Sequence, residues 1–166
     1  MTYPHDQLQL TLSKKGIWQL IIETHPELIR GGFASYLSDI VEIKTGNIDI
    51  EYPILDCHSR YERIVGFADF RIEEIATIVR ADGSQYNRPD YIYCELKTLT
   101  AGFGASLRQI KRYQFHTADG LWLIISPHQE WKEPLLSQGI YWISSDEVME
   151  LTEKLKAREL DKGKED

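Results

Sequence analysis

The chain has 166 residues and 19.3 kDa, of which 42% are apolar and 27% charged, so it has the composition of an ordinary globular protein and not of a disordered or fibrous one. This length is enough for one domain to bury a core without disulfides or metals. The net charge of −7 argues against a protein that coats nucleic acid nonspecifically, although it does not exclude a nuclease, because metal ions held by carboxylates restore positive potential where a phosphate binds.

The N-terminal part of the sequence predicts two helices. The first covers residues 12–23, where apolar residues gather on one side. The second begins at Thr24, which can cap it, while Pro26 is tolerated in the first turn and Glu27 completes a capping box. We expect this second helix to run to about Lys44.

Strands are predicted next. Residues 47–55 alternate apolar and polar side chains, and residues 63–72 form a second strand-like segment. Residues 75–80 either continue that strand or follow a bend. A turn over residues 81–84 then leads to a strand over residues 91–97, which is rich in β-forming residues.

The remaining residues predict alternating helices and strands. In chain order these are a helix over 105–118, a strand over 121–126 that is apolar enough to be buried on both faces, a helix over 128–137, a strand over 140–144 and a helix over 145–159. The whole order predicts an α/β fold with a mixed central sheet flanked by helices. We expect one domain over residues 1–160 and a charged, flexible tail over residues 161–166.

Glu95-Leu96-Lys97 ends one of the predicted strands. Alternate residues of a strand point to the same face, so Glu95 and Lys97 project together and Leu96 faces the opposite layer. The pair is either a surface ion pair or a metal ligand beside a lysine that orients water or handles a proton.

Asp69 closes the segment GFAD, which begins at Gly66 in another predicted strand. Aspartate is depleted in strands, and a carboxylate beside apolar neighbours is costly unless something pairs with it. If the two strands are neighbours, Asp69 and Glu95 converge on one divalent cation. Mg²⁺ takes few carboxylates and keeps waters and phosphate oxygens, which suits metal-assisted hydrolysis of a phosphodiester.

The helix that follows Lys97 carries Gln109 and Tyr113 four residues apart, on one face. A strand-to-helix crossover would turn this face toward the strand ends. Arg108, Lys111 and Arg112 make the same helix the most basic stretch of the chain. They form either a solvated surface or a phosphate-binding track.

Together these three segments resemble the GxxD, ExK and QxxxY motifs of the RecB-like branch of the PD-(D/E)xK nuclease superfamily. The resemblance covers roughly residues 24–144. It implies a restriction endonuclease-like αβββαβ core and Mg²⁺-dependent cleavage of DNA, less often RNA, with Mn²⁺ as a substitute metal.

The resemblance also implies roles for individual residues. Asp69, Glu95 and the backbone carbonyl of Leu96 would bind the metal. Lys97 would orient or activate the attacking water, and the glutamine and tyrosine of the QxxxY motif would support the site and touch the substrate.

The sequence departs from the family pattern in the spacing of its acidic residues. The separation of Asp69 from Glu95 is longer than in many RecB-like members, so the hairpin between them must extend. Asp90 spells the motif more literally, in Pro89-Asp90, but on the same strand it would point to the opposite face from Glu95. We prefer Asp69.

The helical histidine found in many RecB-like proteins has no clear counterpart. Ser35 and Tyr36 occupy the region where it is expected. His25, Glu27 or Glu42 are the candidates for an additional ligand from the first helix.

Cysteines and targeting signals are uninformative about catalysis but bear on location. Cys57 and Cys94 form no CxxC pair and are too few for a four-cysteine zinc or iron–sulfur site; a disulfide between them stays open. No signal-peptide pattern and no apolar run of roughly 20 residues is present, so we expect a cytoplasmic protein without a membrane span.

The sequence therefore predicts a deoxyribonuclease of the repair, recombination, restriction or homing type, endo- or exonucleolytic, acting as a homodimer or in a larger nuclease complex. The alternative is a catalytically inactive nuclease-like module that binds a partner protein. The complete set of Asp69, Glu95 and Lys97 argues against that alternative, because an inactive site has no chemical need for all three.

Overall fold

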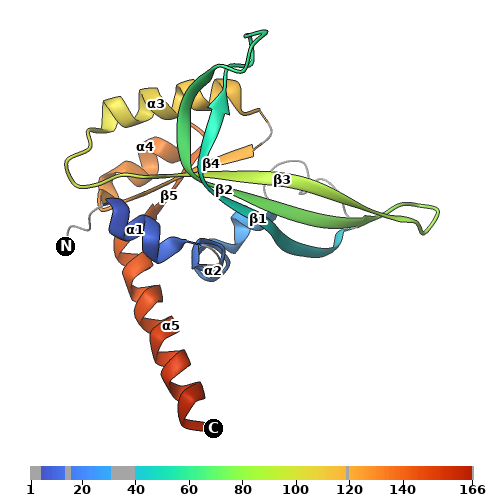
Figure 1. The fold of residues 1–166 in the computed structure, drawn as a ribbon, viewed down its shortest axis with the longest axis vertical. Helices are drawn as coiled ribbons and strands as arrows, with labels where there is room; N and C mark the ends of the chain where they lie inside the picture. Colours follow the sequence, from blue (N-terminus) through green and yellow to red (C-terminus); the bar gives the residue numbers. More distant parts are fainter. Residues whose placement is uncertain (1–4, 14–15, 31–39, 119, 166) are drawn as a thin grey trace.

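Five strands form one mixed sheet in the order β1-β2-β3-β4-β5 in this computed structural model, which describes residues 5–13, 16–30, 40–118 and 120–165 (Figure 1). The strands are β1 Ile40–Leu55, β2 Ile64–Val79, β3 Gln85–Leu96, β4 Gly120–Ser126 and β5 Ile140–Ser144. β1, β2 and β3 pair antiparallel, whereas β3, β4 and β5 pair parallel. The predicted α/β class with a mixed sheet and flanking helices is confirmed.

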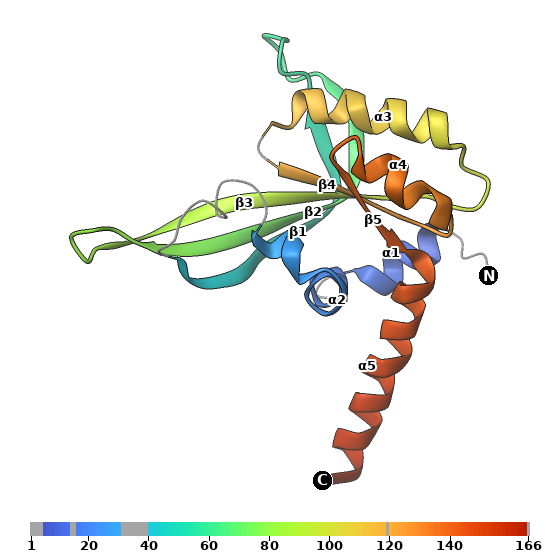
Figure 2. The ribbon, with the colours of Figure 1, turned by 180° about the vertical axis from the view of Figure 1, so that it is seen from behind.

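Helices cover both faces of the sheet, as the opposite view shows (Figure 2). They are α1 His5–Leu12, α2 Gly16–Thr24, η1 Pro26–Arg30, α3 Phe103–His116, η3 Gln129–Trp131, α4 Lys132–Leu136 and α5 Ser145–Glu165. α1, α2 and α5 pack on one face, and α3 and α4 pack on the other. Much of α5 extends away from the body of the fold.

β4 lies between β3 and β5 and contributes to both layers. Leu123 and Ile125 pack against α1, α2 and α5, while Trp122 and Ile124 pack against α3 and α4. All four side chains are buried. A continuous apolar strand is what this position requires, because both of its faces lose contact with water.

The second predicted helix is wrong. Only η1 forms at its start, residues 31–39 lie outside the described residues, and residues 40–44 already belong to β1. Ile43, for example, pairs with Ala76 of β2. The β-branched residues of this stretch suit a strand better than a helix, because branching at Cβ restricts the side chain against the preceding helical turn.

Several other boundaries also differ from the prediction. The expected helix over 12–23 is replaced by α1 and α2, and the one over 128–137 by η3 and the short α4. The segments 63–72 and 75–80 are parts of the single strand β2. α5 continues past 159 to Glu165, through most of the predicted tail.

The topology brings the motif residues to one edge of the sheet. Parallel pairing places the carboxyl ends of β3, β4 and β5 together, and in such sheets these ends form the common place for a binding site. β2 runs antiparallel to β3, so its first half reaches the same edge. α3 connects β3 to β4 and packs on the face of the sheet that it shares with α4 (Figure 1).

Among the helices of the described residues, none combines the length and the apolar character needed to cross a bilayer.

Candidate active site

Asp69 sits where β2 and β3 separate. The regular pairing of these strands ends at Phe70 and Cys94. Beyond that point the backbone N–H of Leu96 donates to Asp69 Oδ2 at 2.7 Å, so the aspartate side chain replaces the backbone carbonyl that a continuing ladder would supply. This bond fixes the carboxylate between the two strands.

Glu95 projects into the same gap and is nearly inaccessible, with 7% of its surface exposed. Its Oε1 lies 3.4 Å from Lys97 Nζ, while its buried Oε2 has no hydrogen-bond partner within the described residues. Burial and then the charge of Asp69 raise the pKa of Glu95 to about 7. Burial also raises the pKa of Asp69. The two carboxylates repel each other when both are ionised, which is why the charge of Asp69 raises the pKa of Glu95. A bound cation would relieve that repulsion.

Lys97 is positioned by its backbone and by α3. Its N–H donates to the Ile125 carbonyl at 2.9 Å, which extends the pairing of β3 with β4 to this residue. Its ammonium group donates to Gln109 Oε1, and Gln109 Nε2 donates to Tyr113 Oη at 3.1 Å. The residues of the ExK and QxxxY motifs therefore form one hydrogen-bonded chain from Glu95 to Tyr113.

Gly66 makes room for that chain. A Cβ atom at this position would overlap the hydroxyl and ring of Tyr113. Without a side chain at Gly66, α3 can lie close enough to β2 for the Tyr113 ring and hydroxyl to pack against that strand. Both ends of the GFAD segment thus contribute to one site. Gly66 leaves room for the Tyr113 side chain, and Asp69 provides its carboxylate.

His5 is a site residue that the sequence reasoning missed. Its Nε2 lies 2.8 Å from Asp69 Oδ1, so a side chain of α1 is within hydrogen-bond distance of the carboxylate. Burial alone would lower the pKa of His5, but the charge of Asp69, with Asp6 and Glu95, raises it overall. The available signal was a short amphipathic pattern after His5, with Leu8 and Leu12 buried at helical spacing.

The basic residues of α3 are exposed but do not point in one direction. Arg112 donates to the Val65 carbonyl at 2.6 Å, toward β2. Lys111 donates to the Gln138 carbonyl at 2.9 Å, toward the turn before β5. Arg108 is four residues before Arg112 and therefore shares its side of the helix.

The other predicted acidic candidates lie elsewhere. Asp90 pairs with Glu74 where β2 and β3 run side by side. Burial and then the charge of Asp90 raise the pKa of Glu74 to about 8. Glu42 is exposed on β1 opposite Thr77, far along the strand from Asp69. Ser35 and Tyr36 lie outside the described residues, as does the side chain of Glu27.

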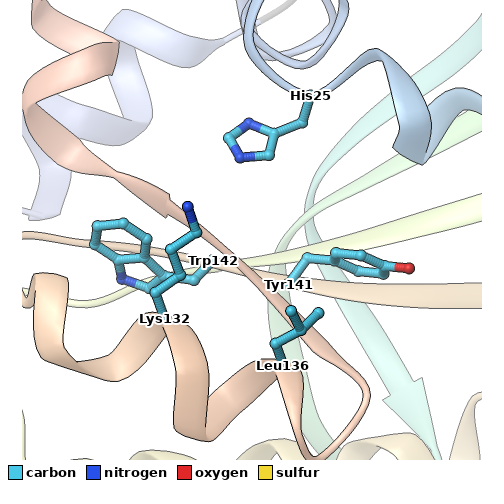
Figure 3. A pocket seen from close by; sticks show the side chains of 5 residues that line it. All are labelled: His25, Lys132, Leu136, Tyr141 and Trp142. Carbon is cyan, nitrogen blue, oxygen red and sulfur yellow. The ribbon is translucent and has the colours of Figure 1, made fainter.

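His25 lines a different cavity, of about 310 Å³, with Lys132, Leu136, Tyr141 and Trp142 (Figure 3). The close-up shows its ring facing the strand β5 and α4 from the end of α2. The lining contains no carboxylate, so this cavity offers no hard-metal site. His25 is therefore not the helical ligand beside Asp69.

The carboxylates at the strand ends suit a divalent cation. Asp69, Glu95 and the imidazole of His5 are the residues that could hold it, although their ligand atoms do not all lie within 4.8 Å of one another, so the side chains would have to draw closer around an ion. The N–H of Leu96, the neighbour of Glu95, holds Asp69 in place. The free oxygen of Glu95 is the observation that fits such an ion, because a buried carboxylate oxygen without a partner is costly.

Comparisons of the chain with protein-family models, with curated proteins and with solved structures find no match.

Proposed function

We propose that this chain is a metal-dependent nuclease that hydrolyses phosphodiester bonds in DNA. The observation that carries the proposal is the gap between β2 and β3, where the buried carboxyl groups of Asp69 and Glu95 interact electrostatically and the ammonium group of Lys97 lies beside Glu95. This donor set matches the oxygen-rich sites that Mg²⁺ and Mn²⁺ use at phosphate substrates.

The order of elements supports a more specific assignment. A helix precedes three antiparallel strands, and α3 then leads to the parallel strand β4, which is the αβββαβ order of the restriction endonuclease-like core. GxxD falls on β2, ExK at the end of β3 with Lys97 just beyond it, and QxxxY on α3. His5 supplies the helical histidine that RecB-like proteins often carry, from α1. We therefore place the chain in the PD-(D/E)xK superfamily as part of this proposal.

Each residue has a distinct task in the proposed reaction. When bound, Mg²⁺ would polarise the phosphodiester and lower the pKa of a water molecule. Lys97, held by Gln109, presents its ammonium group at the site to orient the attacking water and to balance charge on the phosphate. His5 fixes the orientation of the Asp69 carboxylate.

DNA is the proposed substrate because α3 offers cations next to this acidic centre. Arg108 and Arg112 lie on the side of α3 that approaches β2, whereas the chain as a whole is acidic. Phosphate contacts from such side chains position a nucleic acid without reading its sequence. Homodimerisation or assembly with a larger complex would then supply specificity.

The second candidate is an inactive nuclease-like module that binds a partner protein, and the acidic surface is what favours it. The carboxyl pair argues against it. The pKa values of Asp69 and Glu95 are raised even with His5 and Lys97 beside them, so keeping both buried carboxyl groups costs free energy from which an inactive protein gains nothing.

Cleavage of a substrate panel with Mn²⁺ tests the proposal. Plasmid, linear, branched and single-stranded DNA, with RNA as a further arm, would be incubated with the wild type, Lys97→Ala and Lys156→Ala. Lys156 is exposed on α5, away from the site, and controls for the loss of a positive charge.

We expect Lys97→Ala to lower the cleavage rate by about 10²–10⁴-fold and Lys156→Ala to leave it unchanged. Circular dichroism would verify that both variants fold. Equal rates in the wild type and a folded Lys97→Ala would contradict the assignment, as would the absence of cleavage of every substrate.

A further inference from the structure

A second cluster of metal-binding side chains lies at the far end of α3. Asp56 and Cys57 follow β1, and His116 ends α3. Their ligand atoms, an oxygen, a sulfur and a nitrogen, all lie within 4.8 Å of one another. Among the described residues this is the one group of three or more such side chains that meets this spacing.

The distances within the cluster fit a tetrahedral zinc ion. His116 Nδ1 lies 3.3 Å from Cys57 Sγ and 3.8 Å from Asp56 Oδ1. Zinc bonds of about 2.3 Å to sulfur and about 2.0–2.2 Å to nitrogen and oxygen, at tetrahedral angles, put ligand atoms roughly 3.4–3.6 Å apart. These two separations need to change by only a few tenths of an ångström, and the oxygen of Asp56 lies within 4.8 Å of the Cys57 sulfur.

The imidazole of His116 presents the correct atom to the cluster. The backbone N–H of Cys57 donates to His116 Nδ1 at 3.1 Å. A backbone amide can only donate, so Nδ1 carries its lone pair on the side that faces Cys57 and Asp56. A metal ion would take this lone pair in place of the hydrogen bond from the Cys57 amide.

Burial of the three side chains suits a site that exchanges metal with solvent. His116 and Asp56 have 10% and 20% of their side chains exposed, whereas Cys57 is exposed. Two ligands are thus held in place, and the thiol is accessible to an incoming ion. Thiolate and imidazole favour zinc over magnesium, so this set is chemically unlike Asp69 and Glu95.

We propose that Asp56, Cys57 and His116 bind Zn²⁺, with a solvent molecule in the fourth position. The thiol loses its proton to the solvent when the zinc–sulfur bond forms. The ion links the loop after β1 to the end of α3, the helix that also carries Gln109 and Tyr113. Because these ligands are separate from the catalytic residues, the proposal does not depend on the nuclease assignment.

Titration of the metal-free protein with Co²⁺ tests the site in the presence of a reductant that contains no thiol. In the wild type we expect the thiolate-to-cobalt charge-transfer absorption and its loss when Zn²⁺ is added. Cys57→Ala should abolish the absorption, and His116→Ala should weaken Co²⁺ binding by at least tenfold.

Two matched variants serve as controls. His58→Ala removes the neighbouring histidine, whose ring packs against Phe115, and Cys94→Ala removes the cysteine that is buried in the core. Both should bind Co²⁺ as the wild type does. Zn²⁺ should raise the melting temperature of Asp69→Asn, in which the proposed catalytic site is removed, but not that of the double variant Asp69→Asn/Cys57→Ala.

No charge-transfer absorption in the wild type would overturn the proposal. So would an absorption that survives in Cys57→Ala, or one that is lost in a folded His58→Ala. Since no arm measures nuclease activity, a failure here is distinguishable from a failure of the catalytic assignment.

Discussion

Residue Glu95 is held in a position where its ionised form costs free energy. One of its oxygens meets Lys97, but the other is buried without a hydrogen bond from any described residue. Asp69 adds a second negative charge nearby. A carboxyl group in such surroundings either keeps its proton near neutral pH or binds a metal ion. The charge of Lys97 acts in the opposite direction to burial and lowers the pKa of Glu95.

His5 is the residue whose removal should weaken metal binding without removing a carboxylate. Because its ring orients Asp69, we expect His5→Ala to lower Mn²⁺ affinity by about 10–100-fold, as measured by titration calorimetry. His25→Ala is the matched control, since His25 lines the cavity between α2 and α4. An affinity that is unchanged in His5→Ala would show that the histidine has no part in the site.

Sequence patterns predicted that Asp69, Glu95 and Lys97 come together, but they did not predict that His5 joins them. The ExK and GxxD residues are close enough in sequence to their strand signals to be placed from periodicity. His5 is separated from Asp69 by more than sixty positions, and only the packing of Leu8 and Leu12 against the sheet brings them together. Cys57 and His116 are likewise far apart in sequence, and only the fold brings them together at the end of α3.

At the level of elements, the contact of β2 with α3 depends on a glycine. We expect Gly66→Ala to destabilise the protein by about 1–3 kcal/mol and to lower cleavage, because the added Cβ displaces Tyr113 and through it Gln109 and Lys97. Urea unfolding and a rate assay would measure the two effects.

Gly102→Ala is the control for that experiment. Gly102 precedes α3, and a Cβ there meets no atom within 4 Å. This variant should unfold and cleave like the wild type. Similar losses in both variants would contradict the steric explanation.

Elements with one strong signal were predicted better than those with two competing signals. The apolar run of β4 and the strand β5 were located correctly, and α3 was placed within two residues at either end. The segment after Pro26 carries a good helix start but also the β-branched residues of β1. Local capping favoured the helix, whereas pairing with β2 over residues 40–55 decided for the strand.

At the level of the whole molecule, the acidic pair links stability to pH. The folded pKa of Glu95 is raised to about 7 from 4.5, so as pH rises the unfolded chain ionises first. Without metal, the free energy of unfolding should therefore be highest below about pH 4.5 on this account, fall until about pH 7 and then level off. The change is on the order of 1–3 kcal/mol.

Urea unfolding at pH 5 and pH 7 in the presence of a chelator would measure this dependence. Glu95→Gln should reduce the fall, because the amide does not ionise, while Asp69 and His5 still titrate. An identical pH dependence in the wild type and Glu95→Gln would show that this carboxyl group is not strained in the folded protein.

Binding of Mn²⁺ is the measurement that tests the central claim most directly. Titration of metal-free protein, followed by the paramagnetic resonance of free Mn²⁺, would compare Glu95→Gln with Asp49→Asn, all in a Cys57→Ala background. Asp49 is a partly exposed carboxylate that pairs with Arg71 at 3.0 Å. We predict binding by the background protein and by Asp49→Asn, and an affinity at least about tenfold lower in Glu95→Gln, a loss of roughly 1.4 kcal/mol or more. Equal affinities in all three, or no binding by the background protein, would contradict the account.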